Sequence, residues 1–409
     1  MAASEPLTQA GATPGIRWGR VLAALAALLL VLEALSQALI YAYAGKPFGS
    51  LSPYRWSAYG LVRNNPALTS PGFEIDRSGF RSLNEYQKQK PAGTLRVLLL
   101  GGSVLYSGLA GVRLDQYGRV SSAQTIAPYL EALLAADPLF AGYKIEVINA
   151  AVNFNRIVEV SSAYLEEYLH WQPDLVIVFG SINNFYWFRR AGDFAAGQTS
   201  LQERHPFRLE FERLVNEQSL AAFIERAWRT GAEHSAMLAL ASKGSVVLAD
   251  RLVQLSQALA HPSGRPPPAA PRPETADEAR AYMQLFASYA DAMIAAARRA
   301  KQDIAFVWEP ALIHSEGSKQ LSDEERSLLK SLDQTPEKAA QFEASRQAFH
   351  ALLDGAGVPV VDPTDALKTT PETVFIDYVH YTPDGNRFVA SIVYKQLRTL
   401  LAARIKDKK

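Results

Sequence analysis

The stretch LRVLLLGGSV, residues 95–104, decides the fold. A short apolar run that stops at two glycines and a serine is typical of a strand that is buried on both faces and followed by a tight turn. Four more apolar runs follow: IEVI (145–148), LVIVF (175–179), IAFVW (304–308) and VPVV (358–361). Helical stretches lie between them, including 123–136, 158–170 and 275–300. The pattern predicts a three-layer α/β/α fold around a parallel sheet of about five strands.

Composition and charge exclude several classes of protein. The 409 residues are 48% hydrophobic and 20% charged, which is typical of a folded chain and not of a disordered one. Because 42 basic and 41 acidic side chains leave a net charge of +1, we expect no nucleic-acid partner. The chain contains no cysteine, so disulfides, a thiolate nucleophile and cysteine-ligated metals are excluded.

A long apolar segment, VLAALAALLLVLEALSQALIYAYA, occupies residues 21–44. As a helix it would extend about 36 Å, which is enough to cross a bilayer. Three polar residues interrupt it: Glu33, Ser36 and Gln37. We predict an uncleaved transmembrane signal anchor, preceded by a cytoplasmic tail at 1–20. A buried or surface-lying helix is one alternative, and a signal peptide cleaved after Ala44 is another.

The remainder of the chain divides into a connecting segment and a folded domain. Residues 45–91 are rich in turn formers and are predicted to be a tether and lead-in. The domain extends over 92–409 and is predicted to contain a helical insertion at about 188–273. Within this insertion lie the helical stretches 207–228 and 236–260 and the proline-rich linker HPSGRPPPAAPRP. The insertion fits either a lid that shapes a substrate site or a purely structural addition.

Polar residues follow the first three apolar runs, at the sheet edge where ligands of parallel sheets bind. Ser103 comes after the first run, Asn149 and Asn153 lie at or just after the second, and Asn183 and Asn184 come after the third. A serine can act as a nucleophile, and neutral amides can stabilise a developing negative charge. Taken singly, Gly-Gly-Ser is also an ordinary loop and asparagine is a common turn residue.

The segment FIDYVHYTPDGN, residues 375–386, contains an Asp and a His three residues apart. On a turn, Asp377 can hold one imidazole nitrogen of His380 while the other nitrogen faces a nucleophile. Of the seven histidines, only His380 has such a partner in the sequence. His314 is the one rival that follows a predicted strand.

Four motifs occur in the order typical of the SGNH hydrolases, the GDSL-type esterases and lipases. They are Ser103 in GGSV after the first run, a small residue after the second, an asparagine after the third, and D-x-x-H near the C-terminus. The chain resembles the membrane-anchored bacterial branch of this family over roughly 72–184 and 275–400. The resemblance implies a flavodoxin-like arrangement of the sheet. It also implies Ser103 as the nucleophile, His380 as the general base and Asp377 as the residue that orients it. No metal and no organic cofactor are implied.

The resemblance further implies an oxyanion hole made of the Ser103 and Ala151 backbone N–H groups and the Asn183 side chain. The sequence departs from the family pattern at four positions: Gly102 replaces Asp, Ala151 replaces Gly, Ser181 replaces Gly and Asn184 replaces Asp. The position of Asn183 in its block is therefore less well defined than that of His380. An α/β-hydrolase elbow is not indicated, because Leu105 occupies the last glycine position of G-x-S-x-G.

The function that the resemblance implies is a membrane-anchored serine esterase with a Ser-His-Asp triad. Its substrate would be an ester, such as an O-acetyl group on a cell-envelope glycan or a lipid ester. One alternative is an O-acyltransferase that modifies a cell-surface polysaccharide, and another is a non-catalytic member that binds a glycan or a partner. We expect a single pass through the inner (cytoplasmic) membrane, with the domain facing the periplasm or the cell exterior. The aromatic run 185–188 fits either a substrate-binding wall or simple packing. No protein partner is predicted.

Overall fold

The computed structural model describes residues 18–44, 54–56, 62–68, 72–107, 120–153, 155–185, 235–238, 240–241, 276–312, 319–331 and 336–406. The chain forms two compact units. One contains Met1–Leu51 and Leu214–Pro267, and the other contains Ser52–Arg213 and Pro268–Lys409. The predicted helix 207–228, most of the predicted helix 236–260, the linker 261–273 and His314 lie outside the described residues.

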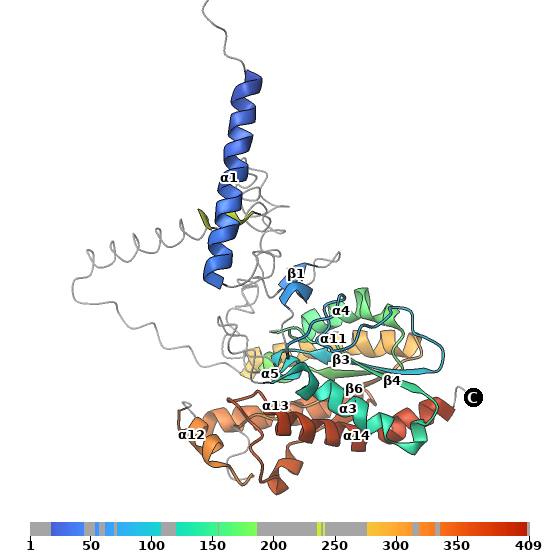
Figure 1. Ribbon diagram of the computed structural model, residues 1–409. Helices are drawn as coiled ribbons and strands as arrows, with labels where there is room; N and C mark the ends of the chain where they lie inside the picture. The colour runs from blue at the N-terminus through green and yellow to red at the C-terminus, as the bar shows by residue number, and fades with distance from the viewer. Residues whose placement is uncertain are drawn as a thin grey trace, which may run out of the picture. The chain divides into compact units, whose positions relative to one another are not determined.

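The second unit is built on a five-stranded parallel sheet (Figure 1). Its strands are β3 (Thr94–Gly101), β4 (Lys144–Asn149), β5 (Leu175–Phe179), β6 (Asp303–Val307) and β7 (Val360–Val361). Their order in the sheet is β4-β3-β5-β6-β7. The ends of each predicted strand differ from those of an observed strand by at most two residues. The prediction of a parallel sheet is therefore confirmed. A separate antiparallel pair, β1 (Tyr54–Trp56) and β2 (Val62–Asn64), was not predicted.

Helices cover both faces of the sheet (Figure 1). On one face α4 (Ile157–Glu166) packs against α11 (Ala276–Arg299). On the other face α3 (Ile126–Ala135) packs against α14 (Pro383–Lys406), whereas α13 (Pro336–Gly355) contacts α11 and the edge strand β7. The predicted three-layer α/β/α fold is therefore confirmed.

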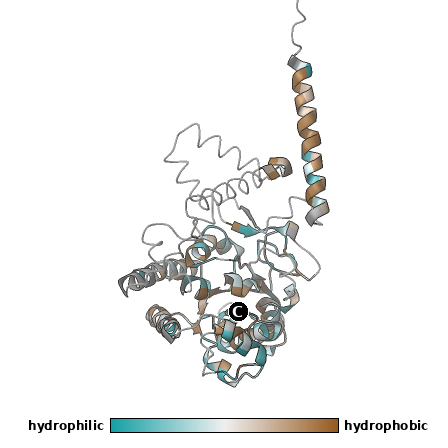
Figure 2. Cartoon of the chain, turned by 90° about the vertical axis from the view of Figure 1, so that its left-hand side faces the viewer, coloured by the Kyte–Doolittle hydropathy of each residue, from teal (hydrophilic) through white to brown (hydrophobic). Residues whose placement is uncertain are grey.

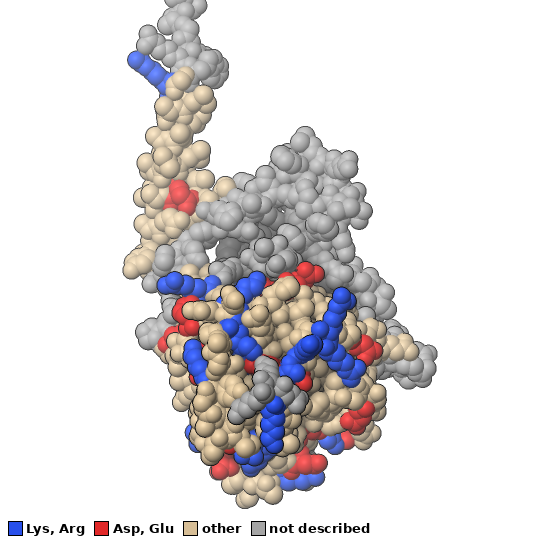
Figure 3. Space-filling view, turned by 90° about the vertical axis from the view of Figure 1, so that its right-hand side faces the viewer, with Lys and Arg blue, Asp and Glu red and all other residues tan. Residues whose placement is uncertain are grey.

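Shorter elements complete the unit. The remaining α-helices are α2 (Ser103–Tyr106), α5 (Ile182–Phe185) and α12 (Asp323–Ser331). The 3-10 helices are η2 (Pro66–Leu68), η4 (Ser122–Gln124), η5 (Pro138–Phe140), η6 (Tyr168–Trp171) and η9 (Asp365–Thr369). On the face shown in Figure 3, basic and acidic side chains of this unit are interspersed.

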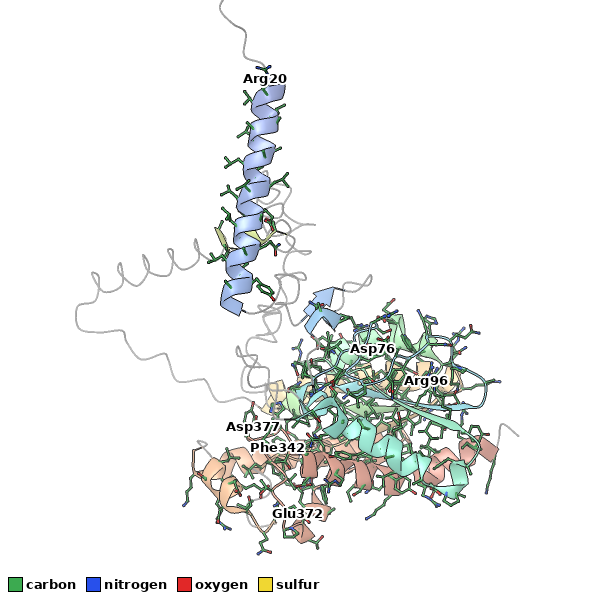
Figure 4. The ribbon with its side chains drawn as sticks, in the orientation of Figure 1. Arg20, Asp76, Arg96, Phe342, Glu372 and Asp377 are labelled. Atoms are coloured by element: carbon green, nitrogen blue, oxygen red, sulfur yellow. The ribbon has the colours of Figure 1, made fainter. Side chains whose placement is uncertain are left out.

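A buried ion pair joins the neighbouring strands β3 and β4. The Arg96 guanidinium donates to Glu146 Oε2 from Nε and Nη2, at 2.9 and 2.7 Å. Its Nη1 atom donates to the Trp171 carbonyl at 2.6 Å. The remaining two N–H groups donate to the Lys88 and Gln87 carbonyls, at 3.1 and 2.9 Å. Because all five N–H groups are used, the charge is tolerated in a strand that is otherwise apolar. Figure 4 shows Arg96 and Asp377 toward opposite ends of this unit.

The segment that precedes β3, predicted as part of a tether and lead-in, contributes to the core from residue 72 onward. Phe73, Ile75 and Phe80 are buried in the same apolar cluster as the sheet. Arg81 is also buried, and its Nη2 donates to the Val120 carbonyl at 2.5 Å. The folded unit therefore includes residues that come well before the first strand of the sheet.

In the first unit, α1 (Trp18–Ala44) is the apolar helix predicted from the sequence. Its stretch Gly19–Ala42 is long and apolar enough to cross a membrane, by length and composition. Figure 2 shows its apolar character along nearly the whole length.

Candidate active site

Ser103 is the first residue of α2 and follows directly after β3 and Gly102. This turn places it at the carboxyl end of β3, an interior strand of the sheet, where open parallel sheets bind ligands. Its side chain is largely buried, with 6% of its surface exposed. Neither its hydroxyl nor its N–H has a hydrogen-bond partner among the described residues. Both groups are therefore available to a ligand.

Asn183, on α5, lies against the turn that carries Ser103. A Cβ atom on Gly102 would be 2.1 Å from Asn183 Nδ2, so the missing side chain makes room for this amide. Asn183 Nδ2 donates to the Asn155 carbonyl at 3.0 Å. Because a primary amide has two N–H groups, the second remains available to a ligand. Asn183 therefore lies against Gly102, the residue that precedes Ser103.

His380 is held by Asp377 through two kinds of contact. The His380 Nδ1 atom lies 2.7 Å from Asp377 Oδ2, and Asp377 Oδ1 accepts the backbone N–H groups of Val379 and His380 at 2.9 and 2.8 Å. The other imidazole nitrogen, Nε2, is buried and has no hydrogen-bond partner among the described residues. An imidazole that is oriented at one nitrogen and unpartnered at the other has the arrangement that a general base requires.

Asp377 is kept ionised by these contacts. Burial alone would raise the pKa of its carboxyl group. The hydrogen bond to His380, the charge of His380 and the two backbone N–H donors outweigh burial, so that the pKa lies below its usual value. Asp377 is therefore suited to stabilise an imidazolium that forms on His380.

A hydrogen bond joins the element that carries Ser103 to the element that follows His380. The Ser107 hydroxyl, directly after α2, donates to Asn386 Oδ1 in the first turn of α14 at 3.2 Å. Asn386 Nδ2 in turn donates to the Gln124 carbonyl at 3.0 Å. These contacts connect parts of the chain that are far apart in sequence, by 279 positions in the case of Ser107 and Asn386.

The Ala151 N–H, predicted as an oxyanion donor, already has a partner in this structure. It donates to Asn149 Oδ1 at 3.1 Å, while Asn149 Nδ2 donates to the Leu105 carbonyl at 3.0 Å. Asn149 therefore ties the end of β4 to α2. For Ala151 to serve as a donor, its bond to Asn149 would have to open when substrate binds.

Asn184, the second asparagine after β5, also has a supporting role. Its Oδ1 atom accepts the N–H of Ile157 at the start of α4 at 3.1 Å, and its Nδ2 atom donates to the Gly180 carbonyl. The side chain thereby fixes the turn that presents Asn183. The aromatic residues 186–188 that follow lie outside the described residues.

Glu309 is a residue of this region that the sequence analysis did not select. It follows β6 and its Oε2 atom accepts the N–H groups of Ser181 and Ile182 at 3.0 and 2.9 Å. Burial raises its pKa to about 7, although the Ile182 and Ser181 donors and the charge of His380 act to lower it. Its other oxygen, Oε1, is buried without a partner among the described residues. Glu309 thus holds the turn before Asn183 and lies within electrostatic range of His380.

We expect Glu309 to make stability depend on pH. Below about pH 4.5 the carboxyl is protonated in both states, but between about 4.5 and 7 only the unfolded state ionises. Raising the pH through this window therefore removes stability, by about 3 kcal/mol when the pKa rises from 4.5 to about 7. The Glu309→Gln variant keeps an acceptor for Ser181 and Ile182 and lacks this titration. Urea unfolding from pH 4 to 8 should show the wild type losing stability relative to the variant, and parallel curves would contradict this assignment.

A second histidine also has a carboxylate partner, contrary to the expectation that His380 alone would. His350 Nε2 lies 2.8 Å from Asp362 Oδ2, which also accepts from Arg346 Nη1 at 2.7 Å. The pair was missed because its members are 12 residues apart and meet only through the packing of α13 against β7. Unlike His380, His350 is about one-third exposed and its carboxylate is shared with an arginine. Among the described residues, no three His, Asp or Glu side chains are grouped as a metal site.

Comparison with known proteins gives structural matches only. No protein-family model matches the sequence, and no curated protein matches it. An acetyl xylan esterase structure is 13% identical, with a TM-score of 0.38, and the match covers 74% of this chain and 98% of that one. An acetyl xylan esterase from Geobacillus stearothermophilus is 13% identical, with a TM-score of 0.39 and coverage of 76% and 97%. A GDSL-like lipase from Parabacteroides merdae is 12% identical, with a TM-score of 0.38 and coverage of 78% and 99%.

Proposed function

We propose that this protein is a serine esterase of the SGNH hydrolase type, with Ser103, His380 and Asp377 as its triad. The observation that supports the proposal most strongly is the hydrogen bonding of the His380 imidazole. Its Nδ1 atom is bound to Asp377 at 2.7 Å and its Nε2 atom is buried without a partner among the described residues. Ser103, whose hydroxyl has no partner among the described residues, follows the interior strand β3 of the sheet.

In the proposed reaction, Ser103 Oγ attacks the carbonyl carbon of an ester and His380 Nε2 takes the hydroxyl proton. The imidazolium is stabilised by Asp377 and then gives the proton to the departing alcohol. Water, deprotonated by His380, attacks the acyl-enzyme; the bond from the acyl carbon to Ser103 Oγ then breaks, His380 returns the proton to Oγ, and the carboxylic acid is released. The charge on the tetrahedral oxygen would be stabilised by the Ser103 N–H and the Asn183 amide. Ala151 would join them only if its hydrogen bond to Asn149 opens.

The location and the substrate class are part of the proposal. The apolar length of α1 supports a single-pass anchor in the inner membrane, with the α/β unit on the periplasmic or outer side. An enzyme held there would meet esters of the cell envelope, such as O-acetyl groups on a glycan or lipid esters. Acyl transfer to a polysaccharide hydroxyl would use the same triad, with the sugar oxygen in place of water.

Labelling with a fluorophosphonate probe tests the proposed nucleophile. We expect the full-length protein to be labelled on Ser103, because a serine activated by a histidine attacks the phosphorus atom irreversibly. The Ser103→Ala variant should not be labelled, while Ser288→Ala, which changes an exposed serine on α11, should be labelled as the wild type is. Equal labelling of all three proteins would refute the assignment of Ser103. Product analysis with an acetyl ester and a glycan acceptor would separate hydrolysis from transfer.

A further inference from the structure

The apolar helix α1 has one face that differs from the rest of its surface. Among residues 19–42, only four are shielded from solvent, and they follow the helical spacing i, i+3, i+4, i+7: Glu33, Ser36, Gln37 and Ile40. This set, called here the polar face of α1, includes all three residues that interrupt the apolar run of the sequence. Residues at this spacing lie side by side on a helix, so the interruptions form one surface and are not scattered.

A segment from the insertion covers this face within the same compact unit. The Glu33 carboxylate accepts the Ser235 hydroxyl at 2.5 Å and the backbone N–H groups of Ala236 and Met237 at 2.8 and 3.1 Å. Gln37 Nε2 donates to the same carboxylate at 2.9 Å. Ala236 is completely buried. The carboxylate therefore has four donors, three of them from residues more than 200 positions away in the chain.

These contacts explain how an acidic residue can be tolerated inside the apolar helix. At 1.5 Å per residue, Glu33 lies about 21 Å from Gly19 and about 14 Å from Ala42 along the axis. A carboxylate at such a depth is costly in lipid unless it faces another part of the protein that supplies donors. Small residues at the contact allow close approach of the two segments, as Ala236 does here.

The covering segment has a composition that suits an apolar environment. Residues 235–242 read SAMLALAS and contain no charged side chain, whereas Glu233 precedes them and Lys243 follows them. Such a stretch is too short to cross a bilayer but can enter it from one side. We infer that residues 235–238 and 240–241 belong to a second membrane-embedded segment of this chain, docked on the polar face of α1 through Glu33. The anchor helix is then retained in the working protein, because cleavage after Ala44 would remove the docking surface.

Cysteine cross-linking in native membranes tests the docking directly, because the natural chain contains no cysteine. Gln37 Nε2 and the Ala236 N–H both bind Glu33 Oε1, so these two residues are neighbours. The pair Gln37→Cys and Ala236→Cys should form an intramolecular disulfide on mild oxidation of the full-length protein. The pair Leu35→Cys and Ala236→Cys is the matched control, since Leu35 is 62% exposed and lies on the opposite side of α1. Adding Glu33→Leu to the first pair should reduce cross-linking at least fivefold.

The depth of the segment is tested separately. With Leu240→Cys alone, at a position that the protein itself leaves exposed, a charged, membrane-impermeant maleimide should label open membrane fragments at least tenfold more slowly than it labels Gln89→Cys, an exposed position of the α/β unit. Detergent and denaturant should remove the difference. Equal cross-linking of the two cysteine pairs, or none in the first pair, would overturn the docking. Cross-linking of the first pair accompanied by rapid labelling of Leu240→Cys would overturn the membrane location.

Discussion

Replacing His380 with alanine should lower kcat for a small acetyl ester by a factor on the order of 10⁴–10⁶, the range found when the base of a serine triad is removed. The reason is that Ser103 Oγ would have no acceptor for its proton at the moment of attack. Asp377→Asn should cost on the order of 10⁴, because an amide cannot stabilise the imidazolium and favours the wrong tautomer of His380. KM should change much less, because these groups act mainly in the transition state.

The chain supplies a matched control for this experiment in the pair formed by His350 and Asp362. His350→Ala also removes a histidine bound to a carboxylate at 2.8 Å, but this histidine is about one-third exposed and its carboxylate is shared with Arg346. We expect its kcat to stay within about twofold of the wild type. Fluorophosphonate labelling and circular dichroism of each variant separate loss of chemistry from loss of fold. If His350→Ala and His380→Ala lowered kcat equally, His380 could not be the general base.

Removing Glu325 should lower the free energy of unfolding by about 3–5 kcal/mol, the usual cost of breaking a buried ion pair from one side. Lys319 Nζ and Glu325 Oε2 lie 2.7 Å apart, and both side chains are inaccessible to solvent. Glu325 Oε1 also accepts the N–H groups of Val374 and Phe375, at 2.8 and 3.2 Å. Glu325→Ala therefore leaves a buried ammonium and two backbone donors without their partner.

Glu325→Ala should also lower esterase activity, because Val374 and Phe375 directly precede the turn that carries Asp377. Urea unfolding at pH 7 measures the stability change, and the same samples measure residual esterase activity. The control is Asp323→Ala on the same helix, α12, where an exposed pair with Arg326 is broken. This change should leave the unfolding midpoint unaltered. A midpoint for Glu325→Ala that equals that of Asp323→Ala would show that the buried pair contributes nothing.

The sheet could be predicted because the sequence signal for each strand lies within the strand itself. A parallel strand that is covered on both faces needs a continuous apolar run, and each of the five runs is written directly in the sequence. The boundaries moved by at most two residues, as at β7, where pairing with β6 covers only Val360 and Val361. The small pair β1 and β2 was missed, because three-residue strands have no periodicity long enough to detect.

The site was only partly predictable, because only some of its contacts join residues that are close in the sequence. Asp377 and His380 are three residues apart, so their contact is encoded in one turn. Glu309 has no such local signal. It is one polar residue after an apolar run, and its importance comes from accepting two N–H groups that belong to another strand end. A closer look at the polar residue after each strand could have found it.

By itself, the sequence determined the five buried strands, the apolar helix and the Asp377–His380 turn, because periodicity, length and short spacing act within one element. Only the tertiary structure decided what these elements meet. It set Asn183 against Gly102, engaged the Ala151 N–H with Asn149, and gave Glu33 its donors from residues 235–237. Contacts of this kind depend on the packing of segments far apart in the chain, and no local pattern specifies that packing.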